Sequence, residues 1–177
     1  MKKIYFILCV SLFALLAIKT NAQTTHIPDN NFLQALKDLG YGAGVVGNNV
    51  PTANIDTITN LDVSSKNISD LTGIQDFVAL TVLRLTKNQL TNLDISKNTA
   101  LIKLYCNLNQ LPSLNISANT ALQTLYCNDN LLSSLDVSKN LALKTLNYAN
   151  NQLPNLDVSA NTALVQLYCT NNQIANI

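Results

Sequence analysis

The chain has 177 residues, of which 12% are charged, and a formal net charge of +1. The length indicates one domain, and the low charge gives no electrostatic basis for binding nucleic acid or an anionic membrane. Hydrophobic residues make up 47%, which is enough for a core and too many for a disordered chain. Leu (31) and Asn (26) are in excess, and Glu and Trp are absent. This skew predicts a periodic chain in which the same residues recur at fixed positions.

Residues 1–22 have the pattern of a secretory signal peptide. Two lysines precede an apolar run over 4–18, which is shorter than the ~20 residues of a membrane-spanning helix. Short residues at 20–22 predict cleavage after Ala22. Cys9 lies near the start of the apolar run rather than at its end, which argues against a lipoprotein. We therefore expect a secreted, extracellular or cell-surface protein without a transmembrane segment in the mature chain.

Residues 23–57 are predicted to form an N-terminal cap. Asp29 followed by apolar residues at helical spacing and then Gly40 indicates one amphipathic helix with an Asp cap and a Gly stop. The apolar residues are Phe32, Leu33, Leu36 and Leu39. A stack of repeats needs such a cover, because an open sheet edge with a bare hydrophobic row would pair or aggregate.

Residues 58–177 contain a repeat of 21 residues. Leu recurs at Leu83, Leu104, Leu125, Leu146 and Leu167, and Asn recurs at Asn88, Asn109, Asn130, Asn151 and Asn172. An earlier unit begins at Leu61, 22 residues before Leu83, with Lys66 in the Asn position. The sequence therefore predicts six rungs.

Alternation within each unit predicts a short strand. Leu104 and Cys106 would face inward, while Tyr105 would face outward. Stacked rungs would bury one continuous Leu core beneath a parallel sheet. The Asn row is expected to donate to and accept from buried backbone groups, and a second row is expected to do the same on the return side: Asn98, Asn119, Asn140 and Asn161. β-branched residues on that side favour extended segments over helices: Ile95, Ile116, Val137 and Val158.

The pattern LxxLxLxxNxL resembles that of leucine-rich repeats, in the short bacterial form with LDVSxN on the return side. Residues 67–83 look like the internalin-type version. The resemblance implies an α/β repeat solenoid, mostly β, which is a curved right-handed stack with a parallel concave sheet, six rungs and a helical N-terminal cap. It also implies ligand binding on the concave face and no catalysis. No C-terminal cap is visible. Ile177 either ends a truncated chain, which we favour, or closes an incomplete rung.

The outward strand positions supply the candidate ligand-binding residues. They are Arg84, Lys103, Tyr105, Asn107, Thr124, Tyr126, Asn128, Asn147, Gln166 and Tyr168. Exposed Tyr beside Arg and Asn is typical of a protein-binding hot spot or of a stacking platform for sugar rings. Tyr also suits a strand and stacks on its neighbour without any ligand, so both interpretations stay open.

Three cysteines occupy the second inward position of their rungs: Cys106, Cys127 and Cys169. On parallel strands their Cβ vectors run side by side, which favours buried thiols over disulfides. Tyr148 takes the same position in the intervening rung. Asp94, Asn115, Asp136 and Asp157 form a row on the return side, where turn capping is favoured over calcium binding.

We find no catalytic set: His26 is the sole histidine, and there is no glycine-rich phosphate loop. No cofactor or metal is expected. The leading hypothesis is a monomeric secreted or surface-displayed module that binds a protein or glycan on its concave face. The alternatives are a structural spacer and a fragment of a larger protein, such as an enzyme, whose functional domain lies beyond residue 177.

Overall fold

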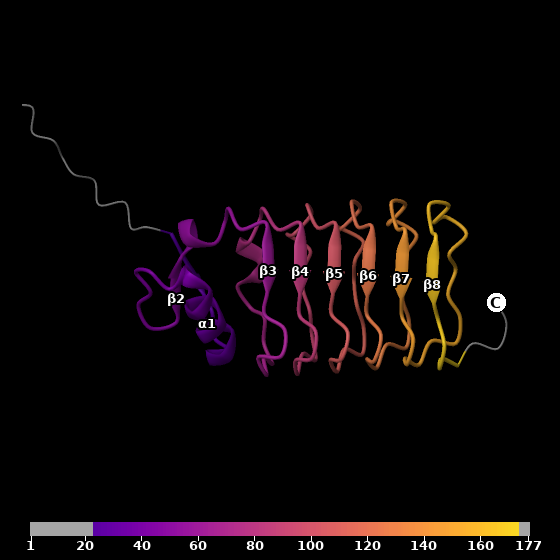
Figure 1. Cartoon of the computed structure of the whole chain (residues 1–177), viewed down its shortest axis with the longest axis horizontal. Coiled ribbons are helices and arrows are strands. Elements are labelled where there is room, and N and C mark those ends of the chain that lie inside the picture. The colour runs from indigo at the N-terminus through magenta and orange to yellow at the C-terminus, as the bar shows by residue number, and fades with distance from the viewer. Residues whose placement is uncertain (1–22, 174–177) are drawn as a thin grey trace, which may run out of the picture.

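The computed structural model describes residues 23–173. Six short parallel strands form one sheet in chain order, and the loop after each strand returns on the other side of the stack (Figure 1). The strands are β3 (Asn60–Asp62), β4 (Val82–Arg84), β5 (Lys103–Tyr105), β6 (Thr124–Tyr126), β7 (Thr145–Asn147) and β8 (Gln166–Tyr168). Their register aligns the recurring Leu from Leu61 to Leu167, which confirms the six predicted rungs and the leucine-rich repeat solenoid.

The first Asn row bonds as predicted. Asn130, for example, accepts from the Leu111 N–H at 3.0 Å and donates to the carbonyls of Cys106 and Cys127, each at 3.1 Å. The same pattern recurs at Asn88, Asn109, Asn151 and Asn172. These amides satisfy backbone groups that the turn after each strand leaves unpaired inside the core.

The second Asn row does only half of what was predicted. The Asn140 side chain donates to the carbonyls of Ile116 and Asn119, but its Oδ1 is buried and has no partner within the described residues. Asn98, Asn119 and Asn161 behave in the same way. The expected acceptance fails because the nearby N–H groups close turns of the return segment itself, as the N–H of Leu143 does on the Asn140 carbonyl.

Before the first rung, helix α1 (Asn30–Leu36) is capped by Asp29, as predicted, but it ends earlier than expected. The next residues form a π-helical turn (Lys37–Tyr41) in which Gly40 has φ 91°, so Leu39 leaves the apolar face and is exposed. α1 packs on the first rungs through the stacked rings of Phe32 and Phe77, whose centroids lie 6.1 Å apart.

Several short elements near this end were not predicted. Strand β1 (Thr24–His26) pairs antiparallel with β2 (Asn49–Pro51), and 3-10 turns occupy Thr52–Asn54 and Ile74–Asp76. These segments carry weak periodicity, because three-residue elements bury too few side chains to leave a pattern. The division into a cap over 23–57 and repeats over 58–177 stays a prediction.

On the return side, the repeats run through turns and irregular backbone, without helix or strand in the described residues after β4. None of the described helices is long and apolar enough to cross a membrane. The predicted signal peptide over 1–22, and Ile177 with its predicted incomplete rung, lie outside the described residues.

Candidate binding face on the parallel sheet

The outward side chains of β3–β8, here called the sheet face, form two rows along the stack. Register places the first row as Asp62, Arg84, Tyr105, Tyr126, Asn147 and Tyr168, and the second as Asn60, Val82, Lys103, Thr124, Thr145 and Gln166. Eight of the ten predicted site residues lie in these rows. The other two, Asn107 and Asn128, lie two residues after the ends of β5 and β6. The structure thus brings all ten together on one face.

After Asp62, the first row carries a preordered group of Arg84, Tyr105 and Tyr126. The two tyrosine rings stack with centroids 5.3 Å apart and an angle of 26° between their planes. The guanidinium of Arg84 lies over the ring of Tyr105 at 5.2 Å, and its Nη1 donates to Asn60 Oδ1 at 2.9 Å. A cation over a ring and an anchoring amide hold these three side chains in place. They are half-buried by one another and still face solvent.

The row is then interrupted at Asn147, which separates Tyr126 from Tyr168. The Asn147 Oδ1 accepts from the N–H of Ala149 at 3.2 Å. Beside it, the hydroxyl of Thr145 donates to Gln166 Oε1 at 3.1 Å. Tyr168 is 47% exposed. The far end of the face therefore carries an isolated ring among amides and hydroxyls.

A second polar ladder runs along the turns after the strands, and sequence reasoning missed it. The position before each buried Asn has φ between 55° and 59°: Lys87, Leu108, Asp129, Asn150 and Asn171. The last three of these residues form the ladder. The side chain of Asn150 donates to Asp129 Oδ1 at 2.6 Å, and that of Asn171 donates to Asn150 Oδ1 at 2.7 Å. Asn tolerates the left-handed conformation, so the Asn-Asn pairs at 150–151 and 171–172 were the available signal.

The inward cysteines are free thiols, as expected. Burial raises the pKa of Cys106 to about 12, and burial together with the neighbouring Cys106 raises that of Cys127 well above its usual value. Tyr148 fills the next inward position as predicted, and its pKa is raised to about 12 by burial and by the adjacent Cys169. Cys169 itself is half-buried on the last described rung. These groups are core residues and lie away from the sheet face.

The acidic row on the return side caps turns, as predicted. Asp136 Oδ1 accepts from the N–H of Ser138 at 2.8 Å, and Asp157 does the same with Ser159. Asp94 and Asn115 repeat the contact. Hydrogen bonds from these serines hold the pKa values of Asp94, Asp136 and Asp157 below their usual range.

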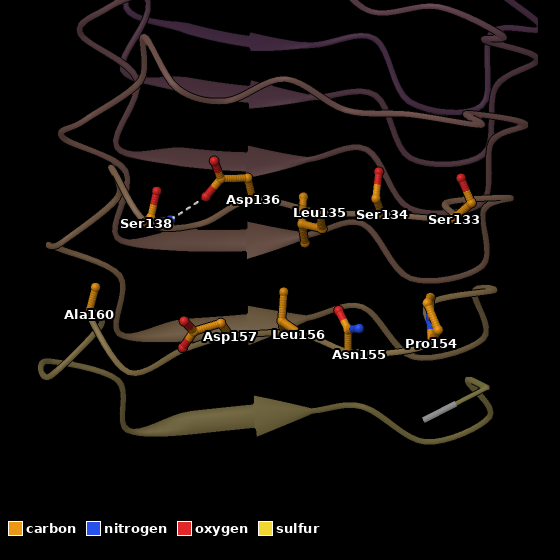
Figure 2. A pocket seen from close by; sticks show the side chains of 10 residues that line it. All are labelled: Ser133, Ser134, Leu135, Asp136, Ser138, Pro154, Asn155, Leu156, Asp157 and Ala160. Atoms are coloured by element: carbon orange, nitrogen blue, oxygen red, sulfur yellow. Dashed lines mark hydrogen bonds between the residues drawn. The ribbon is translucent and has the colours of Figure 1, made fainter. Parts of the chain in front are cut away.

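A hollow of about 290 Å³ lies between two return segments, 133–138 and 154–160. Figure 2 shows the side chains that line it. It is lined mainly by Ser, Leu and the capping carboxylates of Asp136 and Asp157. Within residues 23–173, no three His, Cys or Asp side chains lie close enough together to hold a metal ion. The carboxylates that line the hollow are those that cap the turns, and we take the sheet face as the candidate site.

Comparison with known proteins yields no matching family model. Over 43 residues, 24% of the chain, the sequence is 46% identical to internalin J of Listeria monocytogenes serotype 4b (strain F2365), of which this covers 5%. The solved functional domain of internalin J from Listeria monocytogenes, described as including a cysteine ladder, superposes with a TM-score of 0.79 and 36% identity. That match covers 88% of this chain and 35% of that one.

Internalin F of Listeria monocytogenes gives a TM-score of 0.72 at 29% identity, covering 85% of this chain and 46% of that one. A leucine-rich repeat protein of Leptospira interrogans gives 0.67 at 25%, covering 72% and 35%. The chain thus spans less than half the length of each of these relatives. Strand register, the Asn ladder and these similarities agree, and the chain is a leucine-rich repeat solenoid that is similar to the bacterial internalins.

Proposed function

We propose that this chain is a secreted or surface-displayed binding module that recognises a protein or glycan ligand through its sheet face. The region matched in internalin J is described as that protein's functional domain, which supports a functional rather than a filler role for these repeats. The signal-peptide pattern of residues 1–22 supports export.

The observation that carries the proposal is the ordered group of Arg84, Tyr105 and Tyr126. Its members already hold their positions through the ring stack, the cation over the ring and the hydrogen bond to Asn60. A ligand that binds them therefore loses less side-chain entropy than it would against mobile side chains. Tyr and Arg are also the residue types enriched where interfaces gain most of their binding energy.

The two fully buried thiols have a structural role in the proposal. The internalin J structure is described as including a cysteine ladder. Here Cys106 and Cys127 occupy successive inward positions and are fully buried. We assign them to a short ladder of small apolar side chains that lets neighbouring rungs approach closely, without a part in ligand binding.

The experiment is a glycan array together with a pull-down from host-cell surface protein, using the purified chain. Tyr105→Ala and Tyr126→Ala are the test variants. Leu141→Ala, which removes an exposed side chain outside the sheet, is the control. Binding that survives in Leu141→Ala and falls at least about ten-fold in each Tyr variant supports the proposal. Specific binding that is equal in all variants assigns recognition to another surface, and no binding by any variant favours the structural spacer.

A further inference from the structure

In the first row of the sheet face, the short side chain of Asn147 stands between two longer tyrosines, and this position is here called the gap. Tyr126 pairs with Asn147 and Asn147 pairs with Tyr168, so the two tyrosines stand two strands apart with a short side chain between them. Two inter-strand spacings amount to about 9.6 Å. A ring inserted midway would lie about 4.8 Å from each tyrosine, within the range of stacked rings. Adjacent Tyr105 and Tyr126 already adopt nearly this spacing, at 5.3 Å.

The floor of this gap presents a hydrogen-bond donor. The Asn147 Oδ1 is held by the N–H of Ala149, and within the described residues no acceptor is bonded to its amide NH₂. The residues that flank the gap along β7 and β8 are uncharged: Thr145 and Gln166 on one side, and Ala149 and Thr170 on the other. The gap thus has two aromatic walls, a donor at its floor and hydroxyl or amide groups at its open edges.

We propose that the Tyr126–Asn147–Tyr168 gap holds one sugar ring of an uncharged glycan, between the two tyrosine faces. A pyranose ring has apolar C–H faces and a hydroxyl-bearing rim, so its faces meet the tyrosines while its rim meets Asn147, Thr145 and Gln166. An aromatic side chain of a protein ligand fits less well, because its apolar edges would desolvate these polar groups without pairing them. This inference rests on the proposed function and specifies the ligand class for that same face.

The test is saturation-transfer NMR on the purified chain, with methyl β-galactoside, methyl β-glucoside and methyl β-N-acetylglucosaminide as sugar probes. N-acetyl-phenylalanine amide and N-acetyl-tyrosine amide are the aromatic probes. Asn147→Tyr fills the gap with a fourth ring, and Tyr168→Ala removes one wall at an exposed position. Leu141→Ala is the control, and circular dichroism melting curves establish that each variant is folded.

We expect at least one sugar probe to receive saturation at its ring C–H protons in the wild type and in Leu141→Ala. Asn147→Tyr should abolish that signal. Tyr168→Ala should weaken binding about ten-fold, which corresponds to about 1.4 kcal/mol. If Asn147→Tyr does not fold, Asn147→Leu, which blocks the floor and removes the donor, decides the question by the same loss of signal.

Three results overturn the inference. Sugar binding that is unchanged in Asn147→Tyr and Tyr168→Ala places the sugar elsewhere. Saturation of the aromatic probes alone assigns the gap to a protein ligand, and saturation of no probe in the wild type removes the gap as a ring site. The proposed function survives all three if array or pull-down binding still depends on Tyr105, and it fails separately if that dependence is absent.

Discussion

Replacing Asn130 by Ala is expected to destabilise the protein far more than the same change at Asn128, two residues earlier. Asn130 makes its three main hydrogen bonds inside the core, to the Leu111 N–H and to the carbonyls of Cys106 and Cys127. Without the side chain, the Leu111 N–H is buried and unpaired, at a cost of about 1–3 kcal/mol. The two carbonyls keep second donors in Asn109 and Asn151, so each loses only about 0.5–1 kcal/mol.

The expected loss for Asn130→Ala is therefore about 2–5 kcal/mol. The Asn128 side chain donates only to the neighbouring Asp129, and its Oδ1 has no partner in the described residues, so Asn128→Ala should stay within about 0.5 kcal/mol. With a slope of about 2 kcal/mol per M in urea, the Asn130 variant should unfold at a midpoint about 1–2.5 M lower. Equal midpoints for the two variants would refute the assigned ladder and its register.

Three further predictions follow from single positions. Leu108 is exposed and has φ 56°, a left-handed conformation that costs a non-Gly residue about 1–2 kcal/mol. Asn tolerates this conformation better, so Leu108→Asn should raise the melting temperature of the protein. A lower melting temperature for the variant would contradict backbone strain at Leu108. In the native chain, maleimide should label the half-buried Cys169 first, and it should label Cys106 and Cys127 only when the chain unfolds. Thiol mapping by mass spectrometry checks this order. Rapid labelling of all three thiols would count against the buried ladder. Burial raises the pKa of Asp29, but hydrogen bonds from Ser69, Phe32 and Asp70 outweigh it and hold the pKa below its usual value. The stabilisation by Asp29 is present above the unfolded pKa and is lost as pH falls through the lower folded pKa, so Asp29→Asn should flatten the loss of stability below about pH 5. Parallel stability curves for wild type and variant would refute this.

The repeat-borne features of the site were predictable from the sequence. Any outward residue at 21-residue spacing must share a row once the Leu positions are aligned, so the placement of Tyr105, Tyr126 and Tyr168 on one face followed from counting. The helix was predicted less well, because its end at Leu36 depends on a local π-helical turn that hydrophobic spacing does not encode.

Periodicity alone determined the number of rungs, the inward thiols and the Leu row, which is buried from Leu61 to Leu146, since successive units bury their apolar side in the same way. Leu167 on β8 is 38% exposed. Only the tertiary structure decided which amides have partners. Asn130 and Asn140 both recur every 21 residues, yet the first accepts from a backbone N–H and the oxygen of the second does not. The tertiary structure also decided the hydrogen bond between Asn60 and Arg84 and the gap at Asn147. Both involve residues from different repeat units, and the sequence of one unit does not specify the distances between units.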